Sequence, residues 1–135
     1  MTYNLIAGAL LAFVYIKTKP VIEANKLAKA GDSTRAEVLP GMTGGFEQHG
    51  DAGSFIYWVG YTDDRMKSPG GYVFLSSEKG YSSTIEIMVG IDTDGIIKGV
   101  KVLSQQETPG LGDKIEEIKS GESEPWFTRQ FKGIS

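Results

Sequence analysis

The sequence predicts an α+β domain built on a mainly antiparallel sheet with flanking helices and preceded by an N-terminal membrane helix. Apolar residues alternate with other residues over 85–91, which is the period of a strand with one buried face. Residues 92–95, Asp-Thr-Asp-Gly, then predict a tight hairpin turn, because Asp-Gly tolerates the positive φ that such turns need. A return strand follows over 96–103. The third observation is an uncharged, apolar run at residues 5–16.

The return strand leads into a loop, residues 107–112, with the sequence Glu-Thr-Pro-Gly-Leu-Gly. Pro109 cannot continue a strand ladder, and Gly110 and Gly112 allow the backbone to approach a flat ligand closely. Residues 113–119 follow at helical spacing, so N–H groups at the start of that helix are candidates to bind an anionic or carbonyl-bearing ligand. On these residues alone a plain turn is the alternative.

The other elements are short runs bounded by polar and glycine-rich stretches. Residues 34–48 are mixed in character, and they predict neither a helix nor a strand. Trp126 and Phe131 are expected to close the domain over the helix at 113–119. The further predicted elements are strands at 55–61 and 72–76, a glycine-rich loop at 41–45 and a short helix at 126–133.

The apolar run at residues 5–16 favours a membrane helix, although it is short for one. Twelve helical residues span about 18 Å, whereas the hydrocarbon core needs about 20 residues and 30 Å. A buried core helix and a signal peptide are the alternatives. No basic segment precedes the run and no small-residue cleavage site follows it, which argues against a signal peptide. No residue in the run is polar, which argues against a core helix because every face would need cover. We therefore expect a short or truncated membrane helix over 1–17 and a connecting helix over 18–33.

Composition excludes several classes of function. Fourteen basic and 17 acidic residues give a net charge of −3, and no basic patch suggests a nucleic-acid partner. The absence of cysteine excludes disulfides, thiolate metal sites and cysteine nucleophiles. The single histidine, His49, argues against a zinc site or a histidine-based triad and is predicted to lie in a loop. Asp92 and Asp94 predict a hairpin turn and not a calcium loop, because no further ligands follow at the required spacing. We predict no catalytic residue and no metal site.

Three parts of the sequence together resemble the FMN-binding domain family. They are Tyr81, the string Gly-Ile-Asp-x-Asp-Gly-x-Ile-x-Gly-Val at 90–100, and Glu-Thr-Pro-Gly-Leu-Gly-Asp-Lys at 107–114. The likeness extends over roughly residues 5–135, and its most specific part is 107–112. Within the family, the pattern is most similar to members from membrane-bound, ion-translocating oxidoreductases of the Rnf ferredoxin:NAD type, with the sodium-pumping NADH:quinone reductase as the nearest relative.

The resemblance implies a function in electron transport. The intact protein would be a flavoprotein subunit that relays electrons through FMN to neighbouring membrane subunits and is not catalytic alone. In the family, the FMN phosphate is esterified to a threonine of a Ser-Gly-Ala-Thr-x-Thr motif, which this sequence lacks. We expect residues 34–135 to be an FMN-binding-type domain whose C-terminal part, with that threonine, lies beyond Ser135. The alternative is that this member lacks the attachment threonine. The resemblance also implies that six residues contact the flavin: Glu107, Thr108, Pro109, Gly110, Leu111 and Gly112.

Two arguments disagree about the side of the membrane on which the domain lies. Lys17 and Lys19 follow the apolar run and no basic residue precedes it, which by the positive-inside rule places the domain in the cytoplasm. The resemblance instead implies a single-pass protein of the cell membrane with an extracytoplasmic domain, and we follow the resemblance. The alternative function is a membrane-anchored, flavin-free module whose sheet edge and loop dock partner proteins.

Overall fold

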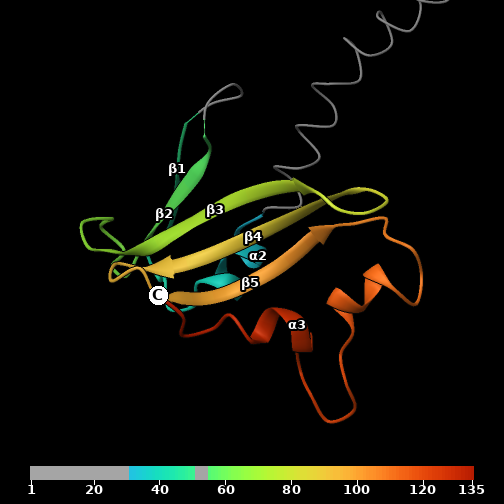
Figure 1. Ribbon diagram of the computed structural model, residues 1–135. Coiled ribbons are helices and arrows are strands. Elements are labelled where there is room, and N and C mark those ends of the chain that lie inside the picture. The colour runs from blue at the N-terminus through green and yellow to red at the C-terminus, as the bar shows by residue number, and fades with distance from the viewer. Residues whose placement is uncertain (1–30, 51–54) are drawn as a thin grey trace, which may run out of the picture. The chain divides into compact units, whose positions relative to one another are not determined.

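A five-stranded antiparallel sheet lies at the centre of the computed structural model, which describes residues 31–50 and 55–135 (Figure 1). The strands follow one another across the sheet in chain order, so each strand pairs with its neighbour in the sequence. This arrangement confirms the predicted antiparallel sheet. The strands are β1 (Gly45–His49), β2 (Tyr57–Tyr61), β3 (Pro69–Lys79), β4 (Thr84–Asp92) and β5 (Ile97–Ser104).

The hairpin between β4 and β5 has the form that its sequence predicts. The N–H of Asp92 donates to the Ile96 carbonyl at 3.0 Å, and Gly95 adopts a φ of +82°. A glycine accepts this left-handed conformation without the steric cost that a side chain would add. The strands expected at 55–61 and 72–76 are also present, as β2 and the longer β3.

One face of the sheet is covered by α2 (Asp32–Val38), a helix that the sequence analysis did not identify. Val38 and Leu39 are buried at the end of this helix, and a side chain on either Gly90 or Gly99 would collide with the Val38 backbone. Because these paired glycines carry no side chain, α2 packs directly on β4 and β5. The buried apolar core comprises Val38, Leu39, Trp58, Val59, Val73, Met88 and Val89.

The sequence around α2 explains why neither α2 nor β1 was identified. Only one residue of the helix, Val38, is buried, so no apolar stripe marks it. Asp32 supports the helix start by its charge at the first turn. The guanidinium carbon of Arg35 lies 4.8 Å from the centre of the Trp58 ring. A basic side chain therefore covers this ring, where an apolar side chain would be the usual signal in the sequence. The prediction that His49 lies in a loop is wrong, because this residue ends β1, where its ring stacks on that of Tyr57 at 5.2 Å.

Two short helices follow β5, and the first differs from the helix predicted at 113–119. It is a 3₁₀ helix, η1 (Gly112–Glu116), and Glu117 is already extended, with φ −67° and ψ 122°. The N–H of Glu117 donates to the Lys114 carbonyl at 3.1 Å, which is the three-residue spacing of a 3₁₀ turn. The predicted α-helix is therefore too long and of the wrong type.

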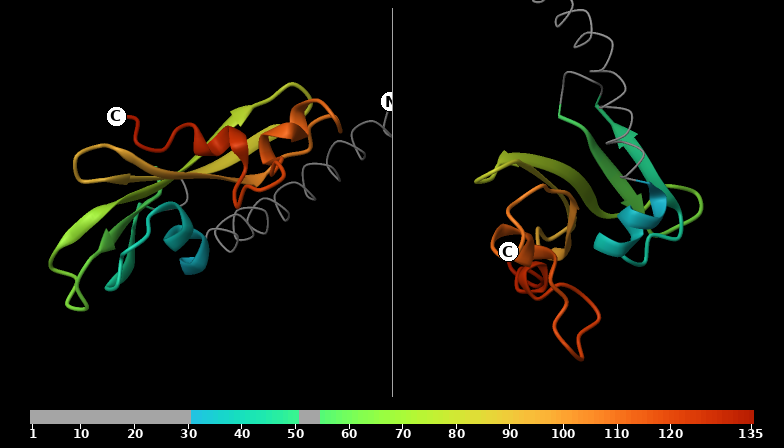
Figure 2. Two further views of the ribbon diagram at one scale, coloured as in Figure 1. Left: turned by 90° about the horizontal axis from the view of Figure 1, so that it is seen from below. Right: turned by 90° about the vertical axis from the view of Figure 1, so that its right-hand side faces the viewer.

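The second helix, α3 (Trp126–Arg129), is shorter than the predicted helix at 126–133. It contacts η1 and β5, and the N–H of Trp126 donates to the Glu117 carbonyl at 3.3 Å. Helix α3 thus lies against η1, whereas the expectation that Trp126 and Phe131 close the domain over the helix at 113–119 stays a prediction. Figure 2 shows α2 and α3 on opposite sides of β5.

The predicted membrane helix at 1–17 lies outside the described residues, as does nearly all of the connecting helix at 18–33, up to the start of α2 at Asp32. Among residues 31–50 and 55–135, no helix combines the length and the apolar character that crossing a bilayer requires.

Candidate functional site

Glu107, the first residue of the predicted flavin loop, is buried and joins this loop to a different hairpin. Its Oε1 accepts hydrogen bonds from the N–H and the hydroxyl of Ser83, both at 2.9 Å. Its Oε2 accepts from the N–H of Ser82 at 3.1 Å. Both serines lie in the turn between β3 and β4, and we call this set of hydrogen bonds the Glu107 clasp. Figure 1 shows this turn and the loop after β5 at the same end of the sheet.

The clasp favours the ionised form of Glu107. The hydrogen bond from the Ser83 hydroxyl is the largest cause of a lowered pKa for this carboxyl. Burial acts in the opposite direction, and backbone N–H groups of Ser82, Ser83 and Tyr81 lower the pKa further. Glu107 is therefore a carboxylate at neutral pH whose oxygens already accept bonds from the protein. Its role as a flavin contact stays a prediction, and the structure gives its side chain another partner.

Two glycines make room for the Glu107 side chain. A Cβ on Gly112 would lie 2.5 Å from the Glu107 Cβ, and a Cβ on Gly80 would lie 2.5 Å from its Oε1. Both distances are far below van der Waals contact, so neither position accepts a side chain without a shift. The close approach at Gly112, which the sequence analysis assigned to a flat ligand, is in this structure an approach of the protein to itself.

The backbone N–H groups of the loop are bonded within the loop. The N–H groups of Leu111 and Gly112 both donate to the Thr108 carbonyl at 3.1 Å. The N–H of Gly110, a residue with φ +78°, donates to Asp113 Oδ1 at 2.7 Å. The anion-binding geometry expected at the start of the following helix is therefore absent between Gly110 and Gly112.

The loop and the turn instead present side chains to solvent. The hydroxyls of Ser82 and Thr108 lie 3.2 Å apart, and both residues are exposed. Leu111 is 74 % exposed, and Tyr81, in the turn, is 95 % exposed. The sequence analysis identified Thr108 and Leu111 but not Ser82. The adjacent serines after Tyr81 were the available signal, but only the fold shows that they meet the loop.

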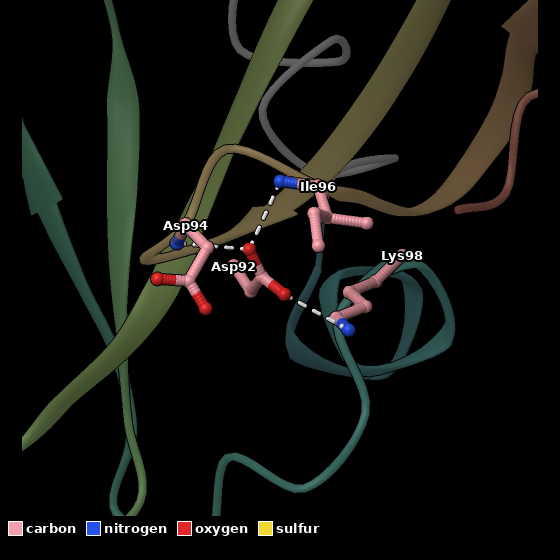
Figure 3. Close-up of polar contacts among 4 residues, drawn as sticks. All are labelled: Asp92, Asp94, Ile96 and Lys98. Atoms are coloured by element: carbon pink, nitrogen blue, oxygen red, sulfur yellow. Dashed lines mark hydrogen bonds and ion pairs between the residues drawn. The ribbon is translucent and has the colours of Figure 1, made fainter. Parts of the chain in front are cut away.

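Asp92 and Asp94 belong to the hairpin turn, as predicted, and the Asp92 carboxylate holds that turn together. Asp92 Oδ1 accepts from the N–H groups of Asp94 and Ile96, both at 2.9 Å, and its Oδ2 pairs with Lys98 Nζ at 2.9 Å (Figure 3). The Lys98 bond is the largest cause of a lowered pKa for Asp92. In the part of the chain that the structure describes, no group of three or more histidine or acidic side chains is placed to hold a metal ion.

The C-terminal part of the chain matches a known family of domains. Residues 80–135 match the FMN-binding domain family. This match begins at Gly80 and contains the β3–β4 turn, the β4–β5 hairpin and the loop at 107–112. The resemblance expected from the sequence is therefore confirmed for this part of the chain.

The chain is also homologous, over part of its length, to the G subunit of ion-translocating oxidoreductase complexes. The G subunit from Aliivibrio fischeri strain MJ11 is 54% identical over 50 residues, which are 37% of this chain and 24% of that protein. The one from Pseudomonas aeruginosa PAO1 is 47% identical over 51 residues, 38% of this chain and 22% of that protein. The chain thus matches about a quarter or less of the length of these relatives.

The described residues fit the ring of an FMN group better than its phosphate. The exposed Leu111 and Tyr81 offer apolar contact, and the two hydroxyls offer hydrogen bonds. A hollow of about 410 Å³ beside the loop carries three carboxylates and one ammonium group, which disfavours a phosphate. Its lining residues are Gln105, Gly110, Asp113, Lys114, Glu116 and Glu117.

A larger cavity, of about 580 Å³, lies beside β5 and is lined by residues of α2 and α3. It shares only Glu116 with the hollow beside the loop. Two ion pairs cross its lining, Lys101 with Glu37 and Lys132 with Glu124. With Glu116, the lining carries three carboxylates and two ammonium groups, so the cavity offers no excess of positive charge to a cofactor phosphate.

Proposed function

We propose that the chain is part of an FMN-bearing electron-carrier subunit of a membrane-bound, ion-translocating oxidoreductase of the Rnf ferredoxin:NAD type. The observation that carries the proposal is the match of residues 80–135 to the FMN-binding domain. The homology to G subunits of such complexes supports the assignment. In that setting the subunit transfers electrons between its neighbours and converts no diffusible substrate by itself.

FMN supplies the redox chemistry when it is bound, and the protein positions it and tunes its environment. In this chain, the exposed side chains of Thr108 and Leu111 contact the flavin ring, and Pro109 and Gly110 shape the loop that carries them. Glu107 and Gly112 fix the position of the loop without contacting the ring, because Glu107 bonds the β3–β4 turn and Gly112 lies against the Glu107 side chain. The acidic hollow beside the loop offers the phosphate no favourable contact, so we assign the phosphate to none of its lining residues.

We further propose that residues 1–17 anchor the protein in the cell membrane by one helix and that the domain lies on the extracytoplasmic side. Residues 5–16 carry no charge. A lysine near the centre of such a helix costs about 2.5–3.5 kcal/mol on insertion scales. Leu10→Lys should therefore reduce the fraction of the protein that sediments with membranes, whereas Lys17→Leu should not.

A flavin titration tests the central part of the proposal. FMN is added to the chain and its fluorescence is followed, because contact with protein groups changes the emission of the ring. We expect saturable binding that Leu111→Ser weakens about tenfold, since the ring loses apolar contact. Ile118→Ser is the matched control, because Ile118 is also exposed, at 54 %, but lies outside the loop.

The rival function, a flavin-free docking module, makes the opposite prediction. The chain would then give no saturable change in FMN fluorescence, and Leu111→Ser would behave like Ile118→Ser. The sheet edge and loop would instead be needed for retention of the protein in the complex. Co-purification of the other subunits with the two variants distinguishes the functions.

A further inference from the structure

We propose that Glu107 is a positioning residue, which holds the Ser82 hydroxyl beside the Thr108 hydroxyl so that this pair binds the pyrimidine edge of the flavin ring. The inference rests on the proposed function as an FMN-binding domain. It adds Ser82, in the β3–β4 turn, to the site, and it removes the Glu107 carboxylate from direct contact with the ring.

The clasp is the structural basis of this positioning. Three hydrogen bonds from Ser82 and Ser83 reach one buried carboxylate across 24 and 25 residues of sequence. The Ser83 hydroxyl also accepts from the N–H of Gln106 at 2.9 Å, which ties the segment just before Glu107 to the same turn. Ionised acceptors form the stronger class of protein hydrogen bonds, so the turn and the loop are held as one unit.

The hydroxyl pair lies directly on the solvent side of this unit. Ser82 donates its N–H to Glu107, and its hydroxyl reaches Thr108, the residue that follows Glu107. When one hydroxyl donates to the other, the pair retains one free O–H and several acceptor lone pairs. The pyrimidine edge of a flavin ring alternates two carbonyl acceptors with one N–H donor. A pair that offers both a donor and acceptors side by side is complementary to that edge.

The surroundings of Glu107 explain why the position needs a carboxylate and not an amide. The groups that act on its carboxylate are all donors: the Ser83 hydroxyl and the N–H groups of Ser82, Ser83 and Tyr81. A glutamine would direct its NH₂ group at some of them and leave an N–H without an acceptor. The site tolerates no added atom at Gly80 either, because a Cβ there would lie 2.5 Å from Oε1.

The first experiment measures the clasp without flavin, by amide hydrogen exchange in the full 135-residue chain. Glu107→Gln should accelerate exchange at Leu111 and Gly112 about tenfold, because the loop opens locally when its anchor is lost. Gly80→Ala should act in the same way, since its methyl group displaces the carboxylate. Amides of Val73 and Met88 in the core should keep their rates, and Glu117→Gln is the control at an exposed glutamate.

The second experiment tests the contact with the ring by comparing FMN with 3-methyl-FMN, which lacks the ring N–H donor. The wild-type chain should bind FMN about tenfold more tightly than the methylated flavin, because the methyl group removes one hydrogen bond. Ser82→Ala and Glu107→Gln should both reduce this preference toward one. Ser77→Ala, at an exposed serine of β3, should leave it unchanged. A purely structural role of Glu107 would lower both affinities and leave their ratio constant.

The outcomes separate the inference from the proposed function. Tight FMN binding with an unchanged preference in Ser82→Ala overturns the inference alone. Equal acceleration of loop and core amides in both Glu107→Gln and Gly80→Ala also overturns it, because the clasp would then be a general stabiliser. Absence of FMN binding by the wild-type chain overturns the proposed contact of this part of the subunit with the flavin ring, and the hydroxyl contact with it. Faster exchange confined to the loop would still support the clasp as the anchor of the loop.

Discussion

Two carboxylates anchor the ends of this sheet, and they do so in different ways. Asp92 bonds N–H groups that lie two and four residues further along the chain, within one turn. Glu107 bonds N–H groups 24 and 25 residues away, in another hairpin. The first carboxylate shapes a turn, whereas the second joins two separate segments. Both carboxylates accept hydrogen bonds from backbone N–H groups. One constrains a few neighbouring residues, whereas the other constrains segments that are distant in the sequence.

The largest expected difference between Glu107 and Asp92 is in their contribution to thermal stability. Glu107→Ala leaves the partly buried N–H groups of Ser82 and Ser83 without their acceptor and should lower the Tm by about 10 °C. Asp92→Ala removes bonds within a single turn, and the Asp94 N–H that it frees is exposed to water, so the Tm should fall by only about 4 °C. Thermal unfolding followed by circular dichroism measures both. Glu117→Ala is the control and should change the Tm by about 1 °C or less.

Substitution of two glycines extends the comparison to packing. Gly112→Val places bulk against the Glu107 side chain and should destabilise the domain by about 1–3 kcal/mol. Gly95→Val, in the Asp92 turn, meets no neighbour within 4 Å but must adopt φ +82°, which costs about 1–2 kcal/mol.

A double-mutant cycle then tells the two causes apart. Glu107→Ala removes the side chain with which the introduced valine collides, so Gly112→Val should cost less in that background. The cost of Gly95→Val should stay the same, because the two sites share no contact. Denaturant unfolding provides the free energies. Additive costs for Gly112→Val and Glu107→Ala would contradict the packing that the structure shows.

The dependence of the Tm on pH should show the contribution of the Glu107 charge to stability, and we expect this effect to be smaller than those above. Folding lowers the pKa of Glu107 from its ordinary value of 4.5, so its contribution to stability is complete above that value. This contribution is lost as the pH falls through the folded pKa. The Tm advantage of the wild type over Glu107→Gln should thus be constant near neutral pH and shrink in acid. A constant difference from about pH 7 down to about pH 2 would show that the charge of Glu107 is not involved.

The smallest effect is expected at the Lys98–Asp92 ion pair. The Lys98 side chain is 44 % exposed, so water and salt screen its attraction to the carboxylate. Lys98→Ala should lower the Tm by about 2 °C or less, and added salt should remove the difference. A larger effect that persists in high salt would indicate that the contacts of Asp92 stabilise the fold about as strongly as those of Glu107.

The same contrast explains which features the sequence predicts. The Asp92 turn, β4 and β5 follow from local patterns, because their determining residues are neighbours in the chain. The Glu107 clasp depends on which hairpin reaches the loop, and no local pattern contains that information. Helix α2 was missed for a related reason, since Gly90 and Gly99 create the surface on which it packs. The loop at 107–112 was recognised by resemblance, but the separate roles of its residues required the fold.

The order of the strands also has a consequence for the folding kinetics. Each strand pairs with its sequence neighbour, so the hairpins close short loops and can form early. The Glu107 clasp needs both β3–β4 and β4–β5 in place before its partners meet. We therefore expect its hydrogen bonds to be absent from the folding transition state, with a φ-value near zero. In a chevron plot, Glu107→Gln should accelerate unfolding and leave the refolding rate unchanged. A slower refolding limb would place the clasp in the nucleus instead.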